Sequence, residues 1–154
     1  MAEEFFETTA DKFIFRVKKG LFYSGEGCWI ALDGDKVTIG VTDFWQKVSG
    51  DVVFVDTLTL GCTLTKGEPM GQIETIKVSI ELASPVSGVI EEVNDLLNEK
   101  PELINEDPFG QGWIYQVKGE KIEEEVKTLL RGEEYFALMK EEIKKELDKI
   151  GGKE

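Results

Sequence analysis

The sequence of 154 residues is strongly acidic, with 18 Lys and Arg against 31 Asp and Glu and a formal net charge of -13. One domain's length and a hydrophobic share of 41% predict a chain that folds by itself around its own core. The negative charge would repel phosphate backbones and anionic lipid, so we expect neither nucleic acid nor a membrane surface as a partner.

The chain contains no histidine. This removes the commonest general base and the usual metal ligand, so we expect no metal site, and an enzyme of the hydrolase kind is hard to build from these residues. The two cysteines, Cys28 and Cys62, lie far apart without metal-ligand spacing and are expected to be free thiols. The acidic start MAEEFFETTADKF lacks the pattern of a leader, and no window is apolar enough to span a membrane, which predicts a cytoplasmic protein.

Residues 12–118 are rich in β-branched side chains and are interrupted by glycine at short intervals, which predicts a mainly β domain. Short strands at this spacing favour a small sandwich or a flattened barrel. A short helix, DFWQKVSG, is expected between two strands and should end at Gly50. The expected strands are 13–17, 28–32, 36–41, 51–56, 71–76, 78–84, 88–94 and 112–118.

The composition changes after Gly119 to a charged helical pattern. Apolar residues recur at steps of three and four from Tyr135 onward, which predicts an amphipathic helix. We expect residues 120–150 to be a helical segment packed on the same β domain, with partner binding as the alternative use of the helix. The apolar positions are Leu129, Leu130, Tyr135, Phe136, Leu138, Met139, Ile143, Leu147 and Ile150.

A single lysine, Lys77, lies between two strand-like runs in IETIKVSIELASPVSG, residues 73–88. Its position predicts the tip of a tight hairpin, where the side chain is unburied and free of packing partners. Such a position suits either a solvated surface residue or a point of covalent attachment. The nearby Glu74 and Glu81 either are recognised by an attaching enzyme or only keep the hairpin polar.

The pattern around Lys77 resembles the lipoyl-attachment segment of lipoyl carrier domains. A small residue, Ser79, follows the lysine, and Gly88 lies eleven residues after it, the separation found in that segment. Biotin carriers share the general fold, but their lysine typically lies between two methionines, whereas here the neighbours are Ile76 and Val78. The resemblance therefore favours lipoate.

A longer resemblance, from about Tyr23 to Glu142, is to the glycine cleavage system H protein family. Its segments are VTIGVTDFWQKVSGDVVFVD, KGEPMGQIETIKVSIELASPVSGVIEEVND and NEKPELINEDPFGQGWIYQVK, and LLRGEEYFALMKEE is similar to the family's C-terminal helix. PELINEDPFGQGW is particularly specific, because the shorter lipoyl domains of 2-oxoacid dehydrogenases lack it. The resemblance implies a lipoyl-domain-like sandwich or flattened barrel over residues 12–118, with a C-terminal helical extension.

The resemblance also implies that Lys77 carries lipoate through an amide and that the protein is a non-catalytic carrier. The dithiolane of lipoate is a cyclic disulfide that accepts a group or two electrons, so the reactive atoms belong to the cofactor. A lipoate-attaching enzyme would load the chain. The carrier would then shuttle an aminomethyl group and electrons between glycine decarboxylase, aminomethyltransferase and dihydrolipoamide dehydrogenase, and we expect it to be a monomer.

One departure from the family keeps two alternatives open. Where the family commonly has His-Glu-Trp, this chain has Gly27-Cys28-Trp29. An H-like lipoate carrier for sulfur-compound oxidation, beside a heterodisulfide-reductase-like complex, would place Cys28 near the dithiolane, whereas otherwise Cys28 is a small buried thiol. The other alternative is an unmodified H-like interaction protein. Four aromatic residues are expected to be packing residues: Trp29, Trp45, Phe109 and Trp113.

Overall fold

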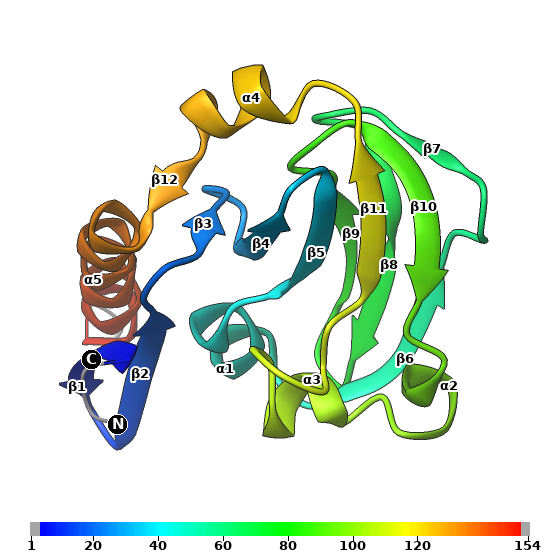
Figure 1. Ribbon diagram of the computed structural model, residues 1–154. Coiled ribbons are helices and arrows are strands. Elements are labelled where there is room, and N and C mark those ends of the chain that lie inside the picture. The colour runs from blue at the N-terminus through cyan, green and yellow to red at the C-terminus, as the bar shows by residue number, and fades with distance from the viewer. Residues whose placement is uncertain (1–3, 152–154) are drawn as a thin grey trace.

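The computed structural model describes the backbone of residues 4–151 and the side chains of residues 4–146. Most strands belong to two antiparallel sheets (Figure 1). The strands of the larger sheet are β3 (Phe22–Tyr23), β4 (Cys28–Asp33), β5 (Lys36–Val41), β7 (Thr63–Leu64), β10 (Gly88–Val93), β11 (Tyr115–Gly119) and β12 (Leu130–Arg131). The strands of the smaller sheet are β6 (Val52–Thr57), β8 (Pro69–Thr75) and β9 (Ser79–Ala83).

The two sheets enclose the main core of the protein. The order in the larger sheet is β12-β3-β4-β5-β11-β10-β7, and in the smaller sheet it is β6-β8-β9. Alternating side chains of β5, such as Val37 and Ile39, join one core cluster with Ile73 and Leu82 of the smaller sheet. The predicted mainly β sandwich is therefore confirmed, and the described strands form two separate sheets rather than a closed barrel.

The predicted helix between strands is α1 (Asp43–Ser49), which ends at Gly50 as expected and is capped at its start by Thr42. The hydroxyl of Thr42 accepts a hydrogen bond from the backbone N–H of Trp45 at 3.1 Å. At the other end Gly50 adopts a φ of 98° and donates its N–H to the carbonyl of Gln46 at 3.0 Å. Two further short helices were not predicted, α2 (Leu96–Glu99) and α3 (Leu103–Glu106). The segment 120–150, predicted to be helical, begins with α4 (Ile122–Glu125) and a 3-10 turn at Val126–Thr128, but strand β12 interrupts it before the long C-terminal helix.

An N-terminal hairpin forms a separate two-stranded sheet beside the sandwich. It consists of β1 (Phe5–Ala10) and β2 (Phe13–Lys18), with Ala10 paired to Phe13 across a two-residue turn. Asp11 in this turn has a φ of 57°, in the left-handed region that tight hairpins use. The sequence pattern predicts β2 but not β1, because none of the β1 side chains is fully buried and its alternation is weak. The expected domain boundary at residue 12 lies within this turn.

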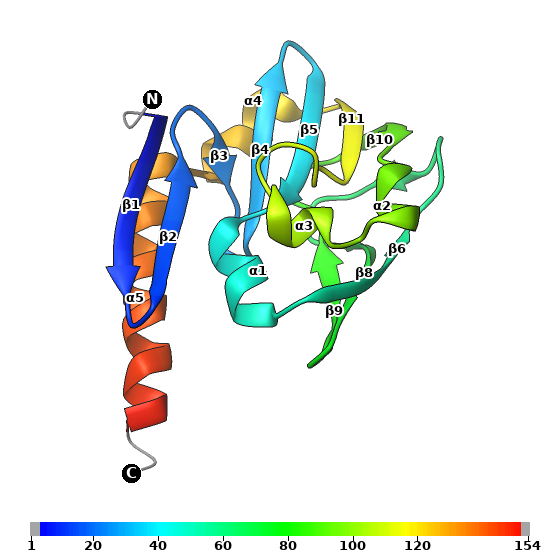
Figure 2. The ribbon, with the colours of Figure 1, turned by 90° about the horizontal axis from the view of Figure 1, so that it is seen from below.

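The C-terminal helix α5 (Gly132–Gly151) lies along the hairpin, as the second view shows (Figure 2). Tyr135, Met139 and Ile143 form its buried stripe and share a second core cluster with Phe15 and Val17 of β2. The predicted amphipathic helix is confirmed, and it contacts β1, β2, β3 and β12. The side chains of Leu147 and Ile150 lie outside the described residues. The division into units 12–118 and 120–150 stays a prediction.

One predicted strand begins later than expected. The segment 112–118 is extended into β11 only from Tyr115, because Gly112 and Trp113 donate their backbone N–H groups to the carbonyls of Asp107 and Gly110 and so belong to a turn. The glycines in this segment were the available signal for that turn. Among the helices of residues 4–151, none has the length and hydrophobicity that crossing a membrane requires.

Candidate functional site

Lys77 lies at the tip of the hairpin that joins β8 and β9. The last strand pair before the tip is Glu74 with Ser79, and Ile76, Lys77 and Val78 form the exposed turn between the strands. The hairpin and exposure that the sequence predicted are therefore present. Because both neighbours of Lys77 are also exposed, an enzyme can approach the ammonium group from solvent.

The conformation of the tip is set by Thr75, a residue that the sequence reasoning did not single out. The buried hydroxyl of Thr75 accepts hydrogen bonds from the backbone N–H groups of Lys77 and Val78 at 3.2 and 3.1 Å. It donates to the carbonyl of Ser49 at the end of α1, at 2.8 Å. A Ser or Thr hydroxyl bonded to the backbone of its own turn is a known turn signal, so the motif Thr-x-Lys offered a clue.

The expectation that Lys77 is free of packing partners is wrong. Its aliphatic stem passes over Gly50, where an added Cβ would lie 3.3 Å from the lysine Cε. Its ammonium donates to the carbonyl of Val48 at 3.2 Å. Gly50 has no side chain, so the lysine stem can lie close to the end of α1. Glycine also adopts the positive φ of this position without strain.

The end of α1 is itself fixed by Asn105 of α3. The Asn105 side-chain amide donates to the carbonyl of Gly50 and to the side-chain oxygen of Gln46, both at 3.1 Å. Its oxygen accepts from the backbone N–H of Val52 at 2.9 Å. Asn105 lies in the PELINEDPFGQGW segment, so this segment supports the surface on which the Lys77 stem lies.

Gly88, the residue eleven positions after Lys77, is required by a close approach of two strands. It pairs with Gly119 of β11, and an added Cβ would lie 2.2 Å from the carbonyl oxygen of Lys118. No side chain fits at this distance. The spacing between Lys77 and Gly88 is thus the length of chain that runs from the hairpin tip to the start of β10, where the chain joins the larger sheet.

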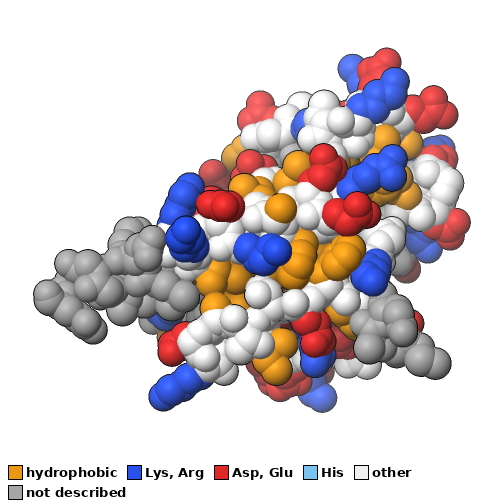
Figure 3. Space-filling model, turned by 90° about the vertical axis from the view of Figure 1, so that its left-hand side faces the viewer, with side chains coloured by type: hydrophobic (Ala, Val, Ile, Leu, Met, Phe, Trp, Pro, Cys, Tyr) orange, Lys and Arg blue, Asp and Glu red, His pale blue; other side chains and the backbone are white. Residues whose placement is uncertain are grey.

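A groove of about 230 Å³ opens beside Lys77, and we call it the Lys77 groove. Its walls come from the N-terminal hairpin, α1, the tip of the β8–β9 hairpin and α5. The molecule seen from the side of α5 and the N-terminal hairpin shows apolar side chains gathered between acidic and basic ones (Figure 3). The groove is lined by Ala10, Asp11, Phe13, Phe15, Phe44, Lys47, Val48, Lys77, Ile143 and Glu146.

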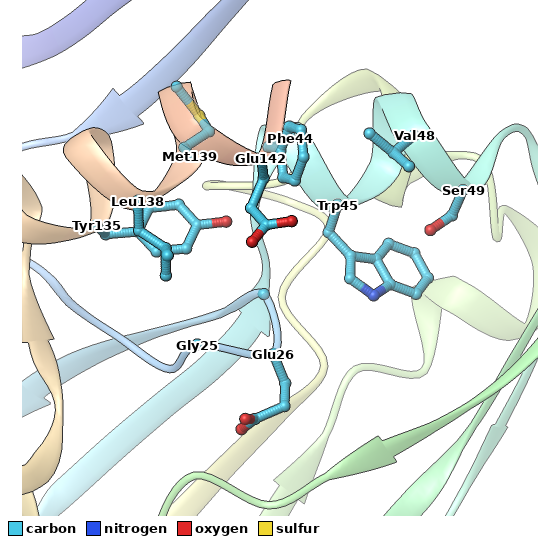
Figure 4. Close-up of a pocket in the computed structure, with 11 residues that line it drawn as sticks. Gly25, Glu26, Phe44, Trp45, Val48, Ser49, Tyr135, Leu138, Met139 and Glu142 are labelled. Atoms are coloured by element: carbon cyan, nitrogen blue, oxygen red, sulfur yellow. The ribbon is translucent and has the colours of Figure 1, made fainter. Parts of the chain in front are cut away.

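A second hollow of about 250 Å³, the Tyr135 cleft, lies between the turn 25–27, α1 and α5 (Figure 4). The carboxylate of Glu142 and the hydroxyl of Tyr135 point into it, opposite the Trp45 ring. Tyr135 bonds to the Thr42 hydroxyl at 2.8 Å, and burial raises the pKa of the Tyr135 phenol to about 12. Phe44 and Val48 line both hollows, whereas Lys77 lines only the groove.

Both cysteines are free thiols, as expected. Cys28 is 1% exposed within the main core, and burial raises the pKa of its thiol to about 12. The interpretation of Cys28 as a small buried thiol is confirmed, and it does not line the Lys77 groove. Cys62 is half-buried. In the part of the chain that the structure describes, no three Cys, Asp or Glu side chains are grouped to hold a metal ion.

The other singled-out residues take the places expected of surface and packing residues. Glu74 and Glu81 are both exposed on the hairpin, so recognition by an enzyme and simple solubility both remain compatible with their position. Trp29 and Trp45 are buried, and Trp113 and Phe109 are partly buried against the second core cluster. Phe109 contacts the Trp29 ring with the centroids 6.3 Å apart, which confirms the packing role.

Two antiparallel sheets packed as a sandwich, with an exposed lysine at a hairpin tip, are the arrangement expected of a lipoyl-domain-like fold. The family model described as "Glycine cleavage H-protein" matches residues 21–142, and the chain belongs to this family. The start and end of the match leave the N-terminal hairpin and the last turns of α5 outside it.

Named relatives agree with the family assignment. The chain is 43% identical over 123 residues to the "Glycine cleavage system H protein" of Geobacillus thermodenitrificans (strain NG80-2), covering 80% of this chain and 96% of that protein. It is 40% identical over 127 residues to the "Probable glycine cleavage system H protein" of Pyrococcus abyssi (strain GE5 / Orsay), covering 82% and 94%. The crystal structure of a glycine cleavage system H protein from Mycobacterium marinum is similar with a TM-score of 0.68 and 33% identity, covering 77% of this chain and 95% of that chain.

Proposed function

We propose that this chain is the lipoylated carrier of a glycine cleavage system and that Lys77 bears the lipoyl group as an amide. The observation that carries the proposal is the geometry of Lys77, which is exposed at a hairpin tip whose backbone is fixed by the Thr75 hydroxyl. An attaching enzyme must bring one lysine nitrogen to an activated carboxyl group. A fixed tip supplies that nitrogen in one place.

The residues around Lys77 fit an acylated lysine. Gly50 leaves room for the aliphatic stem, and the Val48 carbonyl accepts one hydrogen bond, which an amide N–H can still donate after acylation. When bound, lipoate supplies a cyclic disulfide that accepts a group or two electrons. The chain itself positions the arm, so the role is that of a carrier without catalysis of its own.

The partners of such a carrier are glycine decarboxylase, aminomethyltransferase, dihydrolipoamide dehydrogenase and a lipoate-attaching enzyme. The carrier takes an aminomethyl group and electrons from one to the next, and tethering the group to Lys77 raises its effective concentration at each site. The net charge of -13 would speed encounters with a partner surface of opposite charge. We further propose that the protein is a cytoplasmic monomer.

The sulfur-oxidation alternative gains no support from Cys28. A thiol takes part in sulfur exchange as a thiolate that the other sulfur can reach. The Cys28 side chain lies in the core, and burial raises the pKa of its thiol to about 12. Glycine cleavage therefore remains the function that we propose.

The attachment can be tested by intact mass after incubation with lipoate, ATP and a lipoate ligase. One lipoyl group should be added to the wild type, and Lys77→Arg should add none while its circular dichroism spectrum is unchanged. Lys66→Arg is a matched control, because Lys66 is also exposed and also donates its ammonium to a backbone carbonyl, that of Pro85, at 3.1 Å. An adduct that persists in Lys77→Arg would refute the site.

The pathway can be tested with the decarboxylase of the same organism. The lipoylated protein should support exchange of labelled carbon dioxide into glycine, and the unmodified protein should not. Lipoylated Lys66→Arg should match the wild type. If a correctly lipoylated carrier gives no exchange but accepts sulfur from a sulfur donor, the assignment to glycine cleavage fails while the assignment of Lys77 stands.

A further inference from the structure

The turn of the N-terminal hairpin lies beside the attachment lysine, although the two are far apart in the sequence. Ala10, Asp11 and Phe13 line the same groove as Lys77. All three precede residue 21, where the family match begins. The surface around Lys77 therefore includes a segment of this chain, residues 10–13, that the family match does not cover, and we call it the Phe13 turn.

Side chains of α1 hold the N-terminal hairpin in place. On the outer edge of β2, the N–H of Arg16 donates to the Asp43 carboxylate at 2.9 Å. On the same edge, the carbonyl of Ile14 accepts from the Lys47 ammonium. Asp43 and Lys47 are also paired with each other, at 3.0 Å. Two side chains of α1 thus bond to the strand as a neighbouring strand would, so the Phe13 turn has a fixed place beside α1.

Phe13 presents an apolar side chain to solvent at this fixed place. Its ring is 48% exposed, and the buried Phe15 supports it with the ring centroids 6.0 Å apart. Ile76 and Val78, the neighbours of Lys77, are 68% and 47% exposed. Apolar side chains therefore flank the Lys77 ammonium at the hairpin tip and also across the groove, which is the composition typical of the centre of a protein interface.

We propose that the Phe13 turn is a docking contact for the enzyme that attaches lipoate to Lys77, an inference that rests on the proposed function. This enzyme must reach the base of the arm. The Lys77 nitrogen forms the amide bond to the lipoyl carbonyl carbon, the activating group leaves with its electron pair, and the ammonium gives up two protons. Enzymes that act on the finished arm meet its sulfur end, several bonds farther out, and need not cover the groove walls.

The charges at the groove define the surface that the attaching enzyme should present. Asp11 and Glu146 line the groove and are exposed. Lys47 does not offset them, because its ammonium is paired with Asp43, and Lys12 lines a different hollow. The attaching enzyme should therefore carry an apolar pocket for the Phe13 ring with basic side chains beside it.

The kinetics of lipoylation test the contact, with lipoate, ATP and the attaching enzyme of the same organism, followed by intact mass. Phe13→Ser should raise the KM for the carrier about fivefold to tenfold, the effect of no longer burying part of a phenyl ring, and leave kcat unchanged. Leu60→Ser is the matched control. Leu60 is 63% exposed but follows the end of β6, whereas it is the start of β6 that pairs with Thr75 beside the tip. Equal KM values for the wild type and Phe13→Ser would overturn the proposal.

Asp11→Asn is a second test that keeps the backbone of the turn. Asp11 has a φ of 57°, and asparagine also adopts this left-handed region readily. The variant should raise the KM about twofold to fivefold at low salt, and the difference should disappear at high salt. Asp33→Asn, in the exposed turn after β4, makes the same change in net charge away from the groove. A KM raised equally by both variants would mean that only net charge matters, which contradicts the contact.

NMR of the unmodified protein gives a variant-free test, with the attaching enzyme and lipoate added but without ATP. Backbone signals of residues 10–13 and 76–78 should broaden together, and broadening of 76–78 alone would overturn the proposal. Broadening of the turn by the decarboxylase instead, or with rising carrier concentration alone, would assign the turn to that enzyme or to a second copy and would also overturn it. A lipoyl adduct formed with unchanged KM in both variants removes only this inference, whereas absence of any adduct at Lys77 removes the proposed function as well.

Discussion

The hydroxyl of Thr75 donates a hydrogen bond to the carbonyl of Ser49 at 2.8 Å and so joins the attachment hairpin to the end of α1. A second backbone link acts in the same place, because Ile76 donates its N–H to the carbonyl of Asp51 at 3.0 Å. The hairpin tip and the helix end therefore form one unit. A substitution in either one should therefore alter the conformation at Lys77.

Thr75→Val should loosen this unit while keeping its shape. Valine fills the same space, but it leaves the N–H groups of Lys77 and Val78 without the hydroxyl acceptor, which should lower the free energy of unfolding by about 1–3 kcal/mol. Urea unfolding measures the loss, and the initial rate of lipoylation should fall as well. Thr38→Val in β5 is the control, and an equal effect of both changes would contradict the role of the Thr75 hydroxyl.

Asn105→Asp should weaken the support beneath Lys77. Aspartate keeps an acceptor for the Val52 N–H but loses both donors, so the carbonyl of Gly50 loses its partner and faces a negative charge. The Gln46 amide cannot turn its N–H groups toward the new carboxylate without losing its bond to Asp43 at 2.9 Å, so we expect a loss of about 1–3 kcal/mol in the free energy of unfolding. Asn98→Asp, on the exposed surface of α2, should change stability little. The denaturant midpoints of the two variants measure this difference in stability.

The sequence predicted the sandwich well because its signal is local. The alternation of side-chain burial in β5 depends on residues that are neighbours in the sequence, and so do the two caps of α1, Thr42 and Gly50. The position of Lys77 at a tip was readable for the same reason. The contacts of Lys77 were not, since Gly50 and Val48 lie far from it in the sequence and meet it only after folding.

The N-terminal hairpin shows a second limit of prediction from sequence. β1 has no buried residue of its own, because its apolar side chains are only half-covered by α5 and β2. A strand whose apolar surface is completed by a helix over a hundred residues later has a weak pattern when read alone. The Lys77 groove was invisible for this reason, although each of its residues is printed in the sequence.

Gly88→Ala should be far more damaging than an ordinary glycine substitution. Its Cβ would lie 2.2 Å from a backbone oxygen of β11, so the two strands must separate, and we expect a loss of about 3 kcal/mol or more in the free energy of unfolding. Gly25→Ala is the matched control, because an added Cβ there meets nothing within 4 Å. Thermal and urea unfolding should separate the two variants clearly. A mild effect at Gly88 would mean that β10 and β11 are not held in this register.

The protein should lose stability as the pH rises above 9, and Cys28 should account for part of the loss. Burial raises the pKa of the Cys28 thiol from 9.0 to about 12, so the folded chain favours the protonated form. Its contribution is fully present below pH 9, the unfolded value, and is lost as the pH rises toward the folded value. The loss is up to about 1.4 kcal/mol for each pH unit in that window.

The matching measurement compares the wild type with Cys28→Ala by urea unfolding at pH 8 and pH 10. The wild type should lose about 1 kcal/mol more than Cys28→Ala over this interval, because the unfolded alanine variant has no thiol to ionise. Cys62→Ala should behave as the wild type, since its Cys28 is intact. The buried tyrosines Tyr115 and Tyr135, whose pKa values burial also raises to about 12, add a further loss above pH 10 that all three proteins share. Equal pH dependence in the wild type and Cys28→Ala would show that the Cys28 thiol is not buried as described, and it would return Cys28 to the group of residues that can take part in sulfur chemistry.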